Sequence, residues 1–315
     1  METGLKVGID ISKSWFDVAF PKEKEYIHKR YSNDQKGLGK FLSDIPSDAH
    51  CIMEASGVYY LKLALLLHQK SIAVSVINPL VIKRFAQMRM VRAKTDKKDA
   101  VVIAEYGKTE QPEFWNPKEP FQLELQQMAA LLDNYIREHT RLLNQKESFI
   151  ESGVKSLVVI KSVTKQLQNL SKAIKVLEAE MDKIIKDHYQ DMDKRIKTIP
   201  GIGSKASTLL LLVTDGFTRF DNSKQLSAYL GLSPRVYESG SRTKGVSRIC
   251  KMGMGKIRAV LYMCAMTAKS CNRACKEMYE RLKLKGKNGK VILIAIANKL
   301  IRQIFAIAKG KLSYQ

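Results

Sequence analysis

The stretch Val7-Gly8-Ile9-Asp10-Ile11-Ser12 places one carboxylate inside an otherwise apolar run that is typical of a β-strand. A charged side chain in such a run costs several kcal/mol unless it is paired or binds a metal. Asp10 therefore needs a partner, and this strand is the starting point for predicting both fold and function.

Short β-type runs and helical stretches alternate around this strand, from residue 5 to about residue 107. This mixture predicts an α/β domain whose sheet has parallel and antiparallel strands, with a site at the strand ends. The β-type runs are Leu5–Phe20, Tyr26–Tyr31, His50–Met53 and Ala73–Ile77, and helical periodicity occurs at 36–44, 59–69 and 96–107.

Three more acidic residues stand where they could join Asp10. Glu54 ends a second apolar run, and Asp96 and Asp99 are three residues apart on a helix that Thr95 would cap. Taken singly, each acid is explained by a strand end, a surface position or a helix start. Together, four converging carboxylates would require cations, and a pair of Mg²⁺ ions suits phosphoryl transfer.

The region from about residue 120 to 194 changes to helical steps of three and four. Such spacing is typical of a helix that pairs with another helix. It favours a coiled coil between subunits, while an internal hairpin around Gly153 and a bundle packed on its own domain stay open. The regular seam is Val163, Leu167, Leu170, Ile174, Leu177, Met181 and Ile184.

Positive charge is concentrated in the last third of the chain. The 315 residues contain 54 Lys and Arg and 31 Asp and Glu, a net charge of +23. Residues 195–315 hold 24 of the basic and 5 of the acidic residues, or +19. Because apolar residues are interleaved there, a charged tail is a poor explanation, and the pattern predicts a nucleic-acid partner.

The turn Ile199-Pro200-Gly201-Ile202-Gly203 precedes an apolar helix in this basic region. Backbone N–H groups at such a helix start suit a phosphate, as in helix-hairpin-helix DNA binders, although plain helix connections look the same. The rest, from 219 to 312, is mostly helical and is broken by a Gly-, Ser- and Pro-rich loop at 231–245. The predicted nucleic-acid-binding residues are Gly201, Gly203, Arg235, Arg242, Lys244, Arg248, Lys251 and Arg258.

The loop also contains a candidate nucleophile, Ser239. A Ser hydroxyl must lose its proton to act, and Arg235, Arg242 and Lys244 could bind a scissile phosphate. A Ser-Gly pair in a polar loop is more often a turn, so the residues alone leave this role open.

Membrane and secreted classes are disfavoured. The apolar runs at 209–213 and 291–297 are shorter than the roughly 20 residues that a bilayer span needs. The first residues lead directly into a strand, so we expect no secretory leader and a cytoplasmic location. Five Cys without a C-x-x-C pair predict neither a disulfide framework nor a thiolate zinc site.

Several blocks, in order along nearly the whole chain, resemble the DEDD transposases of insertion-sequence family one-ten, relatives of the Piv invertase. The N-terminal blocks are Gly8-Ile9-Asp10-Ile11-Ser12-Lys13, Glu54-Ala55-Ser56-Gly57-Val58-Tyr59, Val76-Ile77-Asn78-Pro79 and Lys94-Thr95-Asp96-Lys97-Lys98-Asp99-Ala100. The C-terminal blocks are Ile199-Pro200-Gly201-Ile202-Gly203, Gly231-Leu232-Ser233-Pro234-Arg235, Glu238-Ser239-Gly240-Ser241 and Gly286-Lys287.

The resemblance implies a RuvC-like, RNase H-type domain at 1–118, a coiled-coil dimerisation region at 119–194 and a mainly helical transposase domain at 195–315. It implies Mg²⁺ at the four acids and Ser239 as a nucleophile that links transiently to DNA, with Ser241 as the alternative. It also implies donor and target DNA, a structured bridge RNA as guide, and dimers or tetramers with a site shared between subunits.

Two other functions compete with a recombinase. A metal-dependent nuclease or junction resolvase would use water in place of Ser239. A non-catalytic nucleic-acid-binding protein would need only the basic surface, and the complete set of acids counts against it.

Overall fold

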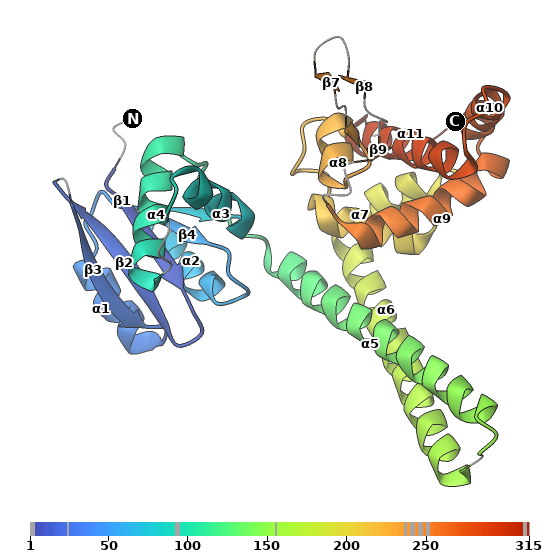
Figure 1. The fold of residues 1–315 in the computed structure, drawn as a ribbon, viewed down its shortest axis with the longest axis horizontal. Coiled ribbons are helices and arrows are strands. Elements are labelled where there is room, and N and C mark those ends of the chain that lie inside the picture. Colours follow the sequence, from blue (N-terminus) through green and yellow to red (C-terminus); the bar gives the residue numbers. More distant parts are fainter. Residues whose placement is uncertain are drawn as a thin grey trace. The chain divides into compact units, whose positions relative to one another are not determined.

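A computed structural model divides the chain into two compact units, residues 1–118 and 119–315 (Figure 1). It describes residues 4–23, 25–91, 95–154, 156–235, 238–239, 243–244, 248–249, 253–310 and 314. For residues 235, 238–239, 243–244 and 248 it describes the backbone alone. Each unit has its own hydrophobic core.

The first unit is built on a five-stranded sheet with the order β3-β2-β1-β4-β5. The central strand β1 is antiparallel to β2 and parallel to β4, while β2–β3 is antiparallel and β4–β5 is parallel. The predicted mixed sheet is thereby confirmed. The strands are β1 (Lys6–Ile11), β2 (Trp15–Lys22), β3 (Glu25–Ser32), β4 (His50–Glu54) and β5 (Ala73–Ile77).

Helices cover both faces of this sheet (Figure 1). Alternate residues of β1 point to opposite faces, so Val7, Ile9 and Ile11 pack with two helices, α1 and α2, in one core. Gly8 and Asp10 therefore face the other side, where α4 lies. The helices are α1 (Gln35–Asp44), α2 (Tyr60–Gln69), α3 (Pro79–Met88) and α4 (Asp96–Glu110).

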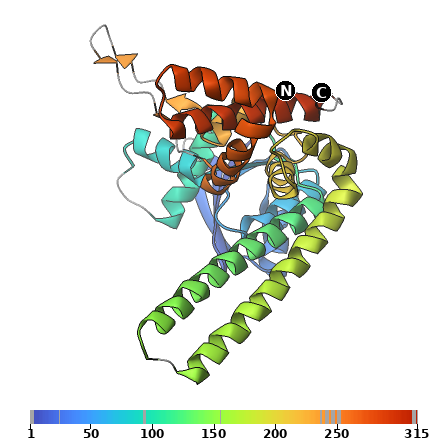
Figure 2. The same cartoon turned by 90° about the vertical axis from the view of Figure 1, so that its right-hand side faces the viewer.

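The second unit begins with two long helices, α5 (Pro120–Glu151) and α6 (Leu157–Lys197), which run side by side as a hairpin (Figures 1 and 2). Every position of the predicted seam in α6 is buried or half-buried within the single chain, with Leu167 and Met181 buried most. The helical pairing is thus internal. Pairing between subunits stays a prediction.

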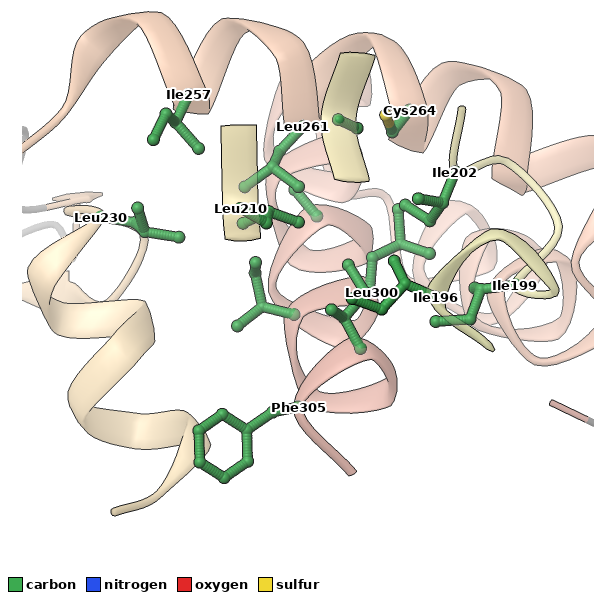
Figure 3. Packing of buried hydrophobic residues seen from close by; sticks show 14 of the residues in the cluster. Ile196, Ile199, Ile202, Leu210, Leu230, Ile257, Leu261, Cys264, Leu300 and Phe305 are labelled. Carbon is green, nitrogen blue, oxygen red and sulfur yellow. The ribbon is translucent and has the colours of Figure 1, made fainter. Parts of the chain in front are cut away.

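The remaining helices pack with the ends of α5 and α6 around one core. Figure 3 shows part of this core. Leu125 of α5, Met181 of α6 and the fully buried Leu300 of α11 belong to this core, so the middle and C-terminal regions form one packed body. Its helices are α7 (Ser204–Thr214), α8 (Ser223–Tyr229), α9 (Gly255–Cys271), α10 (Arg273–Leu284) and α11 (Gly289–Gly310).

In the part of the chain that the structure describes, α11 is the one helix long and apolar enough to cross a membrane by length and composition. No such segment was expected from the sequence, because its uninterrupted apolar runs are short, whereas α11 is apolar over its whole length. Residues such as Ile296 and Ile304 of α11 are fully buried in the core of the second unit, as in a core helix.

Candidate active site

A close approach of α4 to β1 creates the candidate site in the first unit. A Cβ atom added at Gly8 would lie 2.1 Å from the carbonyl oxygen of Ala100 and 2.4 Å from the backbone nitrogen of Ala104. Only glycine fits against α4 at this distance. The close packing brings the first turn of α4 toward the face of β1 that carries Asp10.

Two of the predicted acids occupy that first turn. Thr95 caps α4, because its side chain accepts a hydrogen bond from the backbone nitrogen of Lys98 at 3.3 Å. Asp96 and Asp99 follow, where the positive end of the helix dipole favours carboxylates. The predicted helix and its cap are confirmed, apart from three more residues at its end.

The fourth acid, Glu54, ends β4 beside β1. In the parallel register Ile9 pairs with Met53, so Asp10 and Glu54 are the next residues along the two neighbouring strands. The hydroxyl of Ser56 donates to Oε1 of Glu54 at 2.9 Å and fixes this carboxylate at the strand end.

The charges of the other three predicted acids act on Asp10. The pKa of Asp10 is raised from 3.8 to about 6. Burial is the largest cause, and the negative charges that follow in order of size are Asp99, Glu54, Asp96 and Asp17. Ionised carboxylates therefore oppose one another here, which is the condition that a bound cation relieves.

The described side chains of this region do not form a finished metal centre. Among the described residues, no group of three or more Asp, Glu, His or Cys side chains is arranged to hold a metal ion. The donor chemistry nevertheless fits Mg²⁺, which prefers oxygen ligands and is usually held by one or two carboxylates plus substrate phosphates. Asp10, Glu54, Asp96 and Asp99 are carboxylates of this kind, and the charges of the last three act on the partly buried Asp10.

Two residues of this site were not predicted from the sequence. Asp17 on β2 lies opposite Asp10 in the antiparallel register and is only 3% exposed. Arg30 on β3 binds Asp17 and also donates to Oδ2 of Asp96 at 2.8 Å. The available signal was the charged Asp17 within the apolar run Phe16–Phe20, which is the same anomaly that identified Asp10.

The candidate nucleophile lies in the second unit. Ser239 is in the short strand β7 (Glu238–Ser239), which pairs with β8 (Thr243–Lys244), so that Ser239 is opposite Thr243. β6 (Pro234–Arg235) pairs with β9 (Arg248–Ile249). Short strand pairs thus occupy part of the predicted loop, and β7 and β8 lie away from the helical core of this unit (Figures 1 and 2).

The structure describes some of the predicted basic residues fully, some by their backbone alone and some not at all. The backbones of Arg235, Lys244 and Arg248 are in these strands, while Arg242, Lys251 and the alternative nucleophile Ser241 lie outside the described residues. Nη1 of Arg258, which is half-buried, donates to the carbonyl of Leu230 at 2.9 Å, so this side chain helps to hold α8 on α9.

The predicted turn between helices is present at the end of α6. Gly201 has φ +98°, and a Cβ atom there would lie 2.8 Å from the Cβ of Ala268. Gly203 precedes α7 as its N-cap residue, with open space around the position of a Cβ. The start of α7 is thus uncrowded beside Gly203, and phosphate binding there stays a prediction.

Comparison with known families covers both units. The DEDD transposase model of the IS110 family matches residues 7–153, and a model described as "Transposase IS116/IS110/IS902 family" matches residues 193–280. The first match contains Asp10, Glu54, Asp96 and Asp99, and the second contains Ser239.

Individual relatives match over nearly the full length. The pilin gene-inverting protein of Moraxella lacunata is 33% identical over 96% of this chain and 95% of its own length, and that of Moraxella bovis is 32% identical over the same shares. The transposase for insertion sequence element IS1328 of Yersinia enterocolitica is 25% identical over 94% of each chain. The chain therefore belongs to the IS110 family of transposases and recombinases and is a DNA-processing enzyme.

Proposed function

We propose that the chain is the recombinase of an insertion sequence and exchanges DNA strands through a covalent link between DNA and Ser239. The observation that supports this proposal most is the electrostatic coupling of Asp10 with Asp99, Glu54 and Asp96. The sheet order and these acids support a RuvC-like, RNase H-type domain at 1–118. Residues 119–194 would be the coiled-coil dimerisation region and 195–315 the transposase domain.

In this mechanism two Mg²⁺ ions would be bound by four carboxylates, those of Asp10, Glu54, Asp96 and Asp99. When bound, Mg²⁺ neutralises negative charge at a phosphate and makes a nearby oxygen more acidic. The chain's own contribution is to fix the carboxylates at a strand end and a helix start. Because the pKa of Asp10 is raised to about 6, its carboxylate would be ionised and ready for a cation at neutral pH, whereas below about pH 6 a proton would have to leave before a cation binds.

The covalent step conserves the energy of the phosphodiester. The Oγ atom of Ser239 loses its proton to a base and attacks phosphorus, a P–O bond of the DNA breaks, and the released strand end carries a hydroxyl. A hydroxyl of another strand then attacks the phosphoserine and restores Ser239, so no ATP is consumed. Arg235, Arg242 and Lys244 would bind the scissile phosphate.

Nucleic-acid binding would fall to the basic second unit. The net charge of +19 in residues 195–315 supports contact with donor DNA, target DNA and a guiding bridge RNA. Gly201 and Gly203 would offer backbone N–H groups at α7 to a phosphate, and Arg248, Lys251 and Arg258 would add charge. Dimers or tetramers would place Ser239 of one copy beside the acids of another. The protein would act in the cytoplasm.

Trapping the covalent intermediate tests this proposal. Wild type, Ser239→Ala and Ser241→Ala are incubated with Mg²⁺, end-labelled donor and target DNA and the element's RNA, then denatured and separated by gel. We expect a labelled protein–DNA adduct in wild type and Ser241→Ala and none in Ser239→Ala. Cleavage by Ser239→Ala without any adduct in wild type would instead identify a nuclease that uses water.

A further inference from the structure

Arg30 connects two carboxylates on the sheet face that carries the candidate site. Its Nε lies 3.0 Å from Oδ1 of Asp17, and its Nη2 lies 2.9 Å from Oδ2 of Asp17. The same Nη2 donates to Oδ2 of Asp96 at 2.8 Å. One guanidinium thus ties the start of α4 to the strand that lies beside β1.

The two ends of this connection differ in rigidity. Asp17 is 3% exposed and is also held by Nε2 of His28 at 2.5 Å from its Oδ1, so it is a fixed anchor. The side chain of Asp96 is 61% exposed. An exposed ion pair contributes little to stability, so its effect here is to give the Asp96 carboxylate one orientation.

The contact with Asp96 involves Oδ2, and so it does not use Oδ1. Carboxylates that bind a metal with one oxygen are commonly held through hydrogen bonds to the other, and the partner behind them typically contributes about 10–100-fold to metal affinity. The fork of an Arg side chain can grip an anchor and orient a second carboxylate at once, which a Lys ammonium does not do.

We propose that Arg30 is a positioning residue for the metal site: anchored on Asp17, it holds Asp96 so that Oδ1 faces the cation bound with Asp10. This inference rests on the proposed function, which places Mg²⁺ at these acids. The positive charge of Arg30 acts in the opposite direction, since it repels a cation. If removing Arg30 weakens cation binding, its positioning of Asp96 is the larger effect. If removing it strengthens cation binding, its charge repulsion is the larger effect.

The test measures Mn²⁺ binding to the full chain by electron paramagnetic resonance, without DNA or RNA. The variants are Arg30→Ala, Arg30→Lys and Asp10→Asn. Lys29→Ala is the matched control, because Lys29 is the adjacent residue of β3 and forms a similarly exposed ion pair, 2.9 Å long, with Asp44 on α1. Circular dichroism checks that each variant is folded.

We expect Mn²⁺ to bind Arg30→Ala about 10–100-fold more weakly than wild type, and Lys29→Ala as wild type does. Arg30→Lys should resemble Arg30→Ala, because it keeps the charge and loses the fork. If Asp10→Asn loses Mn²⁺ but Arg30→Ala binds it as tightly as wild type or more tightly, the role of Arg30 is overturned. Full Mn²⁺ affinity in Arg30→Lys overturns it as well. Unchanged binding to Asp10→Asn rejects the metal site itself and the role of Arg30 with it.

Discussion

Replacing Asp10 by Asn should stabilise the metal-free protein at neutral pH. The carboxylate of Asp10 is ionised there against burial and against the charges of Asp99, Glu54, Asp96 and Asp17. Asn keeps the shape and removes the charge. A substitution at the centre of a candidate active site would then raise the melting temperature, as expected where a protein keeps a destabilising group for its function.

The pKa of Asp10 gives the size and the sign of this effect. Its rise from 3.8 to about 6 corresponds to a cost of roughly 3 kcal/mol for the ionised form. Because Asp10 is only partly buried, solvent reduces this to about 1–2 kcal/mol, or roughly 3–8 °C in melting temperature. The folded chain binds this proton more tightly than the unfolded chain, so the cost is absent below pH 4 and complete above about pH 6.

Calorimetry of the full chain in EDTA at pH 7.5 and 4.5 measures this difference. Asp10→Asn should melt higher than wild type at pH 7.5 and by only about a third of that amount at pH 4.5, where most of the cost is absent. When Mg²⁺ replaces EDTA, it should stabilise wild type more than the variant. Asp48→Asn, at an exposed turn of the same unit, is the control for loss of one charge. Equal destabilisation of Asp10→Asn at both pH values would refute the repulsion on which the argument depends.

Three further outcomes follow from the packing and the charge. Gly8→Ala should cost about 1–3 kcal/mol in urea unfolding and weaken Mn²⁺ binding, because its Cβ would meet the Ala100 carbonyl at 2.1 Å and push α4 outward; unchanged Mn²⁺ affinity would contradict this. Gly201→Ala should lower the free energy of unfolding by about 1–3 kcal/mol, since φ is +98° and Ala268 is close, whereas Gly203→Ala should change it little. Equal losses in the two variants would contradict this prediction. In filter binding, the logarithm of DNA affinity should fall linearly with the logarithm of salt concentration, and a flat dependence would disprove a phosphate-binding surface.

Much of the first unit could be predicted from local pattern. The strand with Asp10, the strand with Glu54 and the helix capped by Thr95 are all present, because each rests on signals within a few neighbouring residues. Helix α3 was missed, although Asn78 caps it and Pro79 is its first residue. The ten-residue helix lies between stronger signals, and its start was noticed only as part of a family motif.

Long-range contacts were harder to predict. Arg30 looks like an ordinary exposed residue of an alternating strand, and its link to Asp96 joins residues 66 apart in sequence. The seam of α6 correctly indicates a partner helix, but spacing alone cannot say whether that partner belongs to the same chain. The short strands around Ser239 depend on pairing across a polar loop, where no apolar pattern specifies a register.

Anomalous diffraction from crystals of the protein grown with Mn²⁺ tests most directly whether the four acids form a cation site. We predict a Mn²⁺ peak within about 2.3 Å of a carboxylate oxygen of Asp10, with Glu54, Asp96 or Asp99 supplying at least one more ligand. A peak elsewhere, with these carboxylates unliganded at saturating Mn²⁺, would contradict the account.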